Sequence, residues 1–400
     1  MKFFLPVLFN PLILIFFHLV VITSLTAISQ DTLLTFYYSK NQGGEIFEKY
    51  QAIKKDTGSV KHGLYRCYYT NGTLWQEGTY FNNHLAGEYL IYYDNGMLKQ
   101  KLYFENGLRE GNFESFYPEG SVMQRGKFSH DRFDSILTIY YEKGQVQEQI
   151  SYRDGKKEGT STAWSEKGVK INIRNYTDDK GNGVWEFYHE NGQLKEKGSK
   201  KDDRYDGDFY SFFPDGVVNI HCYYSGGKLN KSYFRFNRNG DTLVACQYHN
   251  DSLHGTWMSW FDNTDPKLKE IHQGEEIGKY EYGKPAGQWK IFHPNGKIRI
   301  TGHYQNGLYE GRWYAYYPND TLKQTGIYRN GKATGTWKFY YPDGQLHKTG
   351  RYKNDEEHGK WHMYYETGEI KIIGSYRNGK RHGTARAYDK SGKVIEEQKY

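Results

Sequence analysis

A glycine recurs every 24 residues through most of this 400-residue chain, and this spacing constrains the fold more than any other feature of the sequence. Two positions on the same grid hold Ser135 and Lys231 instead. A period of this length is typical of arrays in which each repeat is one supersecondary unit. The sequence therefore predicts fourteen tandem units over residues 63–400. The grid glycines, with an eight-residue slip after the seventh, are Gly63, Gly87, Gly111, Gly159, Gly183, Gly207, Gly255, Gly287, Gly311, Gly335, Gly359 and Gly383.

Positions within each unit are counted from the grid residue, which is slot 0. Slot 5 is aromatic in all fourteen units. Slots 2 and 17 are aromatic in most of them, and aromatic residues favour β-strands over helices. The slot 5 side chains are Tyr68, Tyr92, Phe116, Tyr140, Trp164, Tyr188, Phe212, Phe236, Trp260, Phe292, Tyr316, Tyr340, Tyr364 and Tyr388.

Two turn signals divide each unit. One is a glycine at slot 9 that usually follows Asn, Asp or Glu, as in Asp343-Gly344, and the other is an Asn-Gly pair at slots 19 and 20, as in Asn330-Gly331. Such pairs favour two-residue type I′ hairpin turns because Asn and Gly tolerate positive φ. The predicted fold is therefore all-β, an elongated single-sheet antiparallel β-meander of about fourteen tandem β-hairpin repeats.

A two-residue turn at slots 8 and 9 predicts that slot 2 lies opposite slot 15 and slot 0 opposite slot 17. Slot 15 is often glycine, as at Gly326 and Gly350, so an aromatic ring can cover the bare backbone. Slots 2 and 17 then share the core face, and slot 5 points to the opposite face. The slot 5 aromatics are the candidate partner-binding or ligand-binding face, although packing along the sheet is an alternative explanation of their recurrence.

The run from Gly335 to Asn354 contains Gly335, Trp337, Tyr340, Gly344 and Gly350 in this order and resembles the variant form of the MORN repeat. The resemblance covers residues 63–400 and implies tandem β-hairpins. Members of the family are described as scaffolds, membrane-associated modules and antitoxin-like components of bacteria. Units with Ser135, Ser161 or Lys231 depart from the pattern, and we expect them to be less regular.

The N-terminal region lies outside the repeats. Lys2 precedes an apolar stretch over residues 3–27 that ends on Ala27-Ile28-Ser29, and this pattern predicts a signal peptide over residues 1–29, with an uncleaved membrane anchor as the alternative. The mature chain is then exported to the periplasm, the outer envelope or the exterior. We expect an irregular capping segment at 30–62 and an insertion near 263–283 within the repeat array at 63–400.

No motif for catalysis, phosphate binding or metal binding is present, so the sequence predicts no enzyme activity, cofactor or metal. The net charge of +7 is spread among interspersed acidic and basic residues, and this pattern disfavours nucleic-acid binding. Cys222 and Cys246 both occupy slot 15, about 9.6 Å apart at ~4.8 Å per strand, which is too far for a disulfide.

Three functions remain open from the sequence. The first is a scaffold that binds another protein, because a long repeat surface offers many equivalent sites. The second is a module that binds glycans or anionic phospholipid through slot 5 aromatics and neighbouring Lys or Arg. The third, an antitoxin or immunity partner, rests on the family resemblance alone.

Overall fold

The computed structural model describes residues 32–37, 46–55, 58–264 and 274–400. The predicted signal peptide lies outside these residues, as does the centre of the predicted insertion. The chain divides into two compact units, one of residues 1–96 with 104–107 and one of residues 97–103 with 108–400. All regular elements of the described residues are β-strands, as the sequence predicts.

The first compact unit holds the strands that precede residue 97. Each pairs antiparallel with a neighbour in the chain, so that β1 pairs with β2, β2 with β3 and β3 with β4. Their bounds are β1 Thr32–Tyr37, β2 Ile46–Lys55, β3 Gly58–Tyr68, β4 Leu74–Phe81, β5 His84–Leu85 and β6 Gly87–Tyr92.

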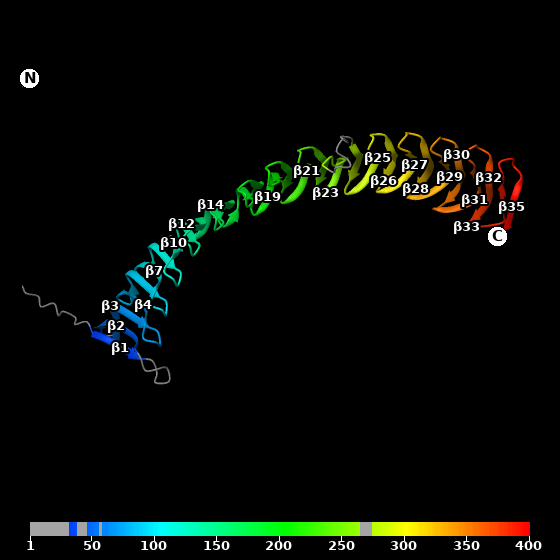
Figure 1. Ribbon diagram of the computed structural model, residues 1–400. Coiled ribbons are helices and arrows are strands. Elements are labelled where there is room, and N and C mark those ends of the chain that lie inside the picture. Colours follow the sequence, from blue (N-terminus) through cyan, green and yellow to red (C-terminus); the bar gives the residue numbers. More distant parts are fainter. Residues whose placement is uncertain (1–31, 38–45, 56–57, 265–273) are drawn as a thin grey trace, which may run out of the picture. The chain divides into compact units, whose positions relative to one another are not determined.

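The second compact unit continues the same up-and-down order, and Figure 1 shows its strands following one another in chain order. β23 pairs directly with β24, although β24 lies within the range 263–283 that was predicted for the insertion, so this part of the range is a regular strand. The bounds are β7 Leu98–Glu105, β8 Leu108–Arg109, β9 Gly111–Phe116, β10 Val122–Ser129, β11 Arg132–Phe133, β12 Ser135–Tyr140, β13 Val146–Arg153, β14 Lys156–Trp164, β15 Lys170–Thr177, β16 Lys180–Gly181, β17 Gly183–Tyr188, β18 Leu194–Lys201, β19 Arg204–Phe212, β20 Val218–Ser225, β21 Lys228–Phe236, β22 Thr242–His249, β23 Ser252–Trp260, β24 Gly274–Glu281, β25 Lys284–Phe292, β26 Ile298–Gln305, β27 Leu308–Tyr316, β28 Leu322–Arg329, β29 Lys332–Tyr340, β30 Leu346–Lys353, β31 Glu356–Tyr364, β32 Ile370–Arg377, β33 Lys380–Arg381, β34 Thr384–Tyr388 and β35 Val394–Lys399.

The predicted register is confirmed in the half of each hairpin that is far from the slot 9 turn. Between β29 and β30, slot 0 pairs with slot 17 as Gly335 with Tyr352, and slot 2 pairs with slot 15 as Trp337 with Gly350. The departing units keep this register, since Ser135 pairs with Tyr152 between β12 and β13. The expectation that these units are less regular was wrong.

The turn at slots 8 and 9 differs from the prediction. Gly344 N donates to the Tyr341 carbonyl at 3.0 Å, Tyr341 N donates to the Gln345 carbonyl at 2.8 Å, and Gly344 has φ of 94°. This is a three-residue loop that ends in a left-handed glycine, where the prediction had a two-residue type I′ turn. A bulge between Phe339 and Tyr340 then shifts the pairing by one residue, which restores the predicted register beyond it.

The turn at slots 19 and 20 matches the prediction. Asn330 and Gly331 have φ values of 50° and 78°, and Arg329 pairs with Lys332 across them. Positive φ at both central residues defines the type I′ turn. Where the sequence has no glycine the conformation is the same, as at Asp202 and Asp203 with φ values of 48° and 66°.

The grid glycine at slot 0 lies at a second bulge. Between β28 and β29 the pairing passes from Ile327 with Thr334 to Thr325 with Lys338, so Gly335 and the two residues after it face one residue of the partner strand. Gly335 has φ of 67° there, a left-handed value that glycine adopts without strain. Glycine therefore recurs every 24 residues because the bulge of each unit needs a residue that tolerates a left-handed φ.

Ser135 takes the same left-handed conformation, with φ of 93°, although it carries a Cβ. We expect Ser135→Gly to raise the free energy of unfolding by about 0.5–1 kcal/mol, because it removes this strain. Ser232→Gly, at an exposed extended position of β21, is the control and should be destabilising by a similar amount. Denaturant titration of both variants measures the difference, and a loss of stability in Ser135→Gly would contradict the role given to the bulge.

The core face carries a chain of aromatic rings along the second compact unit. Trp residues of slot 2 alternate with Tyr residues of slot 17 in edge-to-face contacts, with centroids 5.1 to 6.4 Å apart. Trp337 and Trp361 are 5% and 2% exposed, and burial raises the pKa of Tyr328 and Tyr352. The rings in order are Trp257, Tyr280, Trp289, Tyr304, Trp313, Tyr328, Trp337, Tyr352, Trp361 and Tyr376.

Most slot 15 glycines are covered by a ring, as predicted, but the ring belongs to the following unit. Gly126, whose nearest neighbour is Leu137, and Gly374, whose nearest neighbour is Ala385, are exceptions. A Cβ on Gly326 would overlap the indole of Trp337, and one on Gly350 would overlap that of Trp361. The ring that pairs with Gly350 within its own hairpin is Trp337, and that ring leans the other way. Each unit therefore completes the core of the unit before it.

The cysteines are free and buried, which confirms the prediction for Cys222 and Cys246. They pair in register with Tyr233 and Trp257, the slot 2 residues of the following units. Burial raises the pKa of both thiols to about 11. At these positions cysteine acts as a small hydrophobic side chain that fills the place of the slot 15 glycine.

Candidate functional site

The predicted site residues, the aromatics of slot 5, are all half-buried in the structure. They share the face opposite the core with slot 3, because side chains alternate along a strand. In several units the two rings of one strand stack, as Tyr314 with Tyr316 at a centroid distance of 6.5 Å and His362 with Tyr364 at 6.4 Å. We call this surface, made by slots 3, 5 and 14, the outer face.

Two adjacent units carry the most aromatic part of the outer face. Tyr210 stacks on Phe212 at 6.3 Å and, across the strands, on His221 at 4.3 Å with the ring planes 9° apart. His221 continues to Phe234 at 6.0 Å, and Phe234 stacks on Phe236 at 6.3 Å. These five half-buried rings from β19, β20 and β21 form one row, which we call the aromatic strip.

In other units the same cross-strand pair, slot 3 with slot 14, is an ion pair. Arg125 Nε lies 2.7 Å from Glu114 Oε1, and Arg386 Nε lies 2.7 Å from Glu397 Oε2. Exposed pairs of this kind contribute about 0–1 kcal/mol each. The outer face therefore changes along the array from charged pairs to stacked rings and back, and a partner would not meet the same chemistry in every unit.

At Tyr188 the outer face combines both kinds of contact. Its hydroxyl donates to Glu186 Oε2 at 2.7 Å, and Lys197 Nζ lies 3.0 Å from the other oxygen of the same carboxylate. Burial and this hydrogen bond raise the pKa of Tyr188 to about 12, and the bond holds the pKa of Glu186 below its usual value. The Tyr188 ring is thereby fixed in place on the outer face.

The backbone of slot 5 has a structural role that the sequence analysis missed. Tyr341 at slot 6 donates its hydroxyl hydrogen to the carbonyl of Tyr364, the slot 5 residue of the next unit, at 2.9 Å. The same bond is present in at least eight of the described units, with histidine Nε2 as the donor in two of them. The recurring Tyr or His at slot 6 was the available signal. The donors are Tyr69, Tyr117, Tyr141, His189, His293, Tyr317, Tyr341 and Tyr365.

The turns next to these bonds are joined in the same direction. Asn295 Nδ2 donates to the Pro318 carbonyl at 2.7 Å, and Asn319 Nδ2 donates to the Pro342 carbonyl at 2.9 Å. Both bonds run from slot 8 of one unit to slot 7 of the next. The ends of successive hairpins are therefore hydrogen-bonded to one another, which holds the backbone at slot 5 in place at one edge of the outer face.

Within the described ranges, no group of three or more His, Cys, Asp or Glu side chains is arranged to hold a metal ion. None of the described elements is a helix of the length and apolarity needed to cross a membrane.

The comparison with protein families decides the identity of the repeats. The MORN repeat variant model matches nine segments, at residues 61–82, 85–106, 134–154, 182–201, 285–306, 309–330, 333–354, 357–378 and 381–400. The chain is a MORN repeat variant protein. The matched segments of the family model begin one or two residues before the slot 0 residue, so each contains one slot 9 turn and one slot 5 aromatic.

A search of the curated proteins found no significant match. Solved structures with some likeness include the TcdB2-TccC3-Cdc42 complex (9% identity, TM-score 0.16, covering 91% of this chain and 26% of that one). Others are the Photorhabdus luminescens Tc holotoxin pore (11% identity, TM-score 0.15, 91% and 23%) and a porin-like protein from Bacteroides uniformis (7% identity, TM-score 0.15, 64% and 87%). The chain spans about a quarter of the toxin-complex chains. Similarity at these TM-scores gives no basis for assigning a function.

Proposed function

We propose that this MORN repeat variant protein is a non-catalytic scaffold that binds a partner protein through its outer face. The observation that carries the proposal is the aromatic strip, in which five half-buried rings stack in one row across three strands. Aromatic side chains held rigidly by their neighbours lose little entropy on binding and dominate many protein interfaces. Ion pairs elsewhere on the outer face supply the polar contacts that orient a partner.

The strip can be tested with two double variants. Tyr210→Ser with Phe234→Ser removes two of its rings, whereas Tyr210→Phe with Phe234→Tyr keeps every ring and serves as the matched control. Both sites are on the outer face, so the core aromatic chain stays intact in both variants. We expect the serine variant to bind the partner at least about tenfold more weakly and the control to bind normally.

The measurement uses the full chain as bait on an envelope fraction, followed by titration of the purified partner with each variant. Glycan arrays and vesicles with anionic phospholipid are tested in parallel. Equal binding of the serine variant and the control would overturn the role of the strip. Binding of glycan or vesicles, with no protein partner, would support the alternative of a glycan-binding or phospholipid-binding module.

We infer separately that the chain is exported. The inference is supported by Lys2, the apolar stretch over residues 3–27 and the small residues at 27 and 29. Cell fractionation with N-terminal sequencing tests it, and the expected result is a mature chain that begins at Gln30 outside the cytoplasm. An intact chain that begins at Met1 in the cytoplasm would contradict export.

A further inference from the structure

Successive units pack through one recurring pair of residues, slot 15 of one unit and slot 2 of the next. The two side chains compensate for each other in size. Gly198 pairs with Phe209, and the order of sizes is reversed where Ile150 pairs with Ser161. In every such pair of the sequence but one, at least one residue is larger than alanine.

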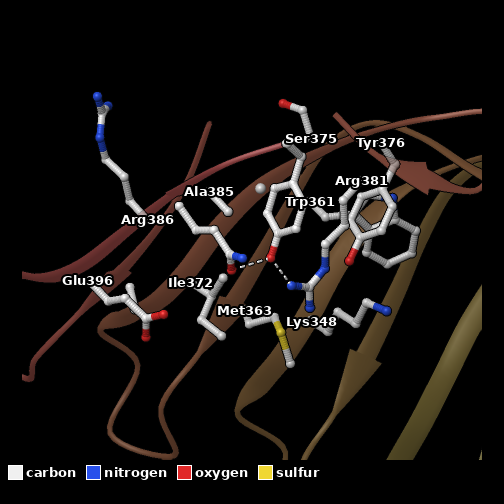
Figure 2. A pocket seen from close by; sticks show the side chains of 14 residues that line it. Lys348, Trp361, Met363, Ile372, Ser375, Tyr376, Arg381, Ala385, Arg386 and Glu396 are labelled. Atoms are coloured by element: carbon white, nitrogen blue, oxygen red, sulfur yellow. Dashed lines mark hydrogen bonds between the residues drawn. The ribbon is translucent and has the colours of Figure 1, made fainter. Parts of the chain in front are cut away.

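The exception is Gly374 with Ala385, in which both residues are small. A Cβ placed on Gly374 would meet only the Ala385 Cβ, at 3.6 Å, whereas one placed on the slot 15 glycines of the three preceding units, Gly302, Gly326 and Gly350, would meet an indole. A cavity of about 140 Å³ opens at this point, and Trp361, Tyr376 and Tyr400 contribute to its wall (Figure 2). The missing ring of slot 2 accounts for the cavity.

An earlier unit shows what occupies the equivalent space. The indole of Trp313 lies over Gly302, where a Cβ would overlap it. Its Nε1 donates to the carbonyl of His303 at 3.2 Å, and its ring meets that of Tyr304 edge to face at 5.1 Å and 87°. Three consecutive residues thus supply a flat floor, a hydrogen-bond acceptor and an aromatic wall.

At the cavity the same three slots hold Gly374, Ser375 and Tyr376. Trp313 has a second aromatic neighbour, the slot 17 residue Tyr328, at a centroid distance of 6.3 Å. In the unit that contains Ala385, slot 17 holds Tyr400, which lines the cavity. The cavity therefore presents the floor, the acceptor and both aromatic walls of an indole site, without the indole.

The acceptor retains capacity for a ligand. The Ser375 carbonyl accepts one hydrogen bond, from His382 N at 2.8 Å. A carbonyl oxygen has two lone pairs. In an equivalent position the Asn175 carbonyl accepts both a backbone N–H, from Asn182 at 2.9 Å, and the indole N–H of Trp185, at 3.1 Å.

Two of the three cations around the cavity are paired with carboxylates. Lys348 Nζ lies 2.8 Å from Glu357 Oε1, and Arg386 Nε lies 2.7 Å from Glu397 Oε2. The guanidinium of Arg381, which Figure 2 labels, donates to the Tyr400 hydroxyl. Glu396 is the remaining anion of the lining and balances Arg381 in number. Because the lining and its ion-pair partners carry no net charge, they favour a neutral ligand.

We propose that this cavity binds a neutral indole ring, which lies over Gly374 and donates its N–H to the Ser375 carbonyl. The ring takes the place that tryptophan fills in the preceding units. The volume of the cavity is suitable for such a ring, because an apolar cavity of about 150 Å³ is known to bind benzene. This inference is independent of the aromatic strip, which lies in other units and on the opposite face.

Calorimetric titration of the full chain with indole tests the proposal, with 1-methylindole as the matched ligand that lacks the N–H. We expect indole to bind and 1-methylindole to bind about fivefold more weakly, since one hydrogen bond is lost. Ala385→Trp restores the missing ring, so it should abolish indole binding and raise the melting temperature. Absence of indole binding up to its solubility, or unchanged binding in Ala385→Trp, would overturn the proposal.

A second variant covers the case in which Ala385→Trp does not fold. Gly374→Ala places a methyl group on the floor of the cavity without overlap, since its nearest neighbour is the Ala385 Cβ at 3.6 Å. It should weaken indole binding at least about tenfold while the circular dichroism spectrum is unchanged. Full binding by a folded Gly374→Ala would place the ligand elsewhere.

The ring can come from a small indole compound or from a tryptophan side chain of a protein. A peptide with the sequence of residues 335–341, which presents Trp337 on a strand, separates these sources. Tighter binding of the peptide than of N-acetyltryptophanamide supports a protein source, and equal or weaker binding supports a small molecule. Failure of both, together with free indole, would contradict the indole assignment.

Discussion

Trp361→Ala is expected to lower the free energy of unfolding by about 3–5 kcal/mol, the largest effect of a single side chain in the array. Trp361 is 2% exposed, covers Gly350, and meets Tyr352 and Tyr376 edge to face at 5.1 and 6.4 Å. Its removal leaves a cavity and breaks the chain of core rings in one step. Because repeat arrays can unfold in parts, hydrogen exchange in β30 to β32 should accompany denaturant titration.

The control for this substitution is Trp164→Ala, a slot 5 tryptophan on the outer face. Trp164 is half-buried, and only its backbone carbonyl takes part in the bond from Tyr141 of the preceding unit, at 2.9 Å. The expected loss is about 1–2 kcal/mol, in proportion to the smaller apolar area that it buries. Equal losses at Trp361 and Trp164 would contradict the assignment of the core to the slot 2 face.

Gly350→Ala is expected to cost about 3 kcal/mol, although alanine normally stabilises a strand relative to glycine. The added Cβ would overlap the indole of Trp361, which has to move out of the core. Gly374→Ala is the matched control at the same slot of the next unit, where the Cβ meets only Ala385 at 3.6 Å. This second substitution should be neutral or slightly stabilising in denaturant titrations of both variants.

A double-mutant cycle identifies the cause of the difference. If the Trp361 ring is what excludes the methyl group, Gly350→Ala should cost little in the Trp361→Ala background. A full cost in that background would mean that Gly350 is needed for its backbone and not for the ring above it.

Much of this fold could be predicted because local signals recur in every unit. Type I′ turns at slots 19 and 20 follow from residues such as Asn330 and Gly331 that tolerate positive φ. The pairing of Trp337 with Gly350 was also predicted correctly, even though the assumed turn at Asp343 and Gly344 was wrong. The actual loop has three residues where two were assumed, which shifts the pairing by one residue, and the bulge after Phe339 shifts it back. The two errors in the prediction, the turn and the missing bulge, therefore cancelled.

The direction of the Trp361 ring could not be predicted from pairing alone. Gly350 lies between Trp337 and Trp361 on its two neighbouring strands, and either ring could cover it. The choice depends on the side-chain rotamer, which a register argument does not contain. The cavity at Gly374 was missed for a related reason. Ala385 is exceptional only when slot 15 of one unit is compared with slot 2 of the next, and the sequence analysis compared slots within one hairpin.

The candidate site was predicted at the level of a face and not at the level of its contacts. Alternation along the strand places all slot 5 aromatics opposite the core, and they are half-buried there. The stack of His221 on Tyr210 needed the cross-strand neighbours of slots 3 and 14, which the analysis of slot 5 did not consider. The bond from Tyr341 to the Tyr364 carbonyl joins different units, and a prediction made within one hairpin cannot include it.

Where a slot 15 glycine is covered by a ring of the next unit, the array has a direction during synthesis. When Gly350 emerges from the ribosome, Trp361 is still inside it, so the core of that unit stays open until the following strand emerges. At translation rates of about 5–20 residues per second, one unit takes about 1–5 seconds to make. The growing end of the nascent chain therefore always exposes one unfinished unit, which is the species that a chaperone would meet.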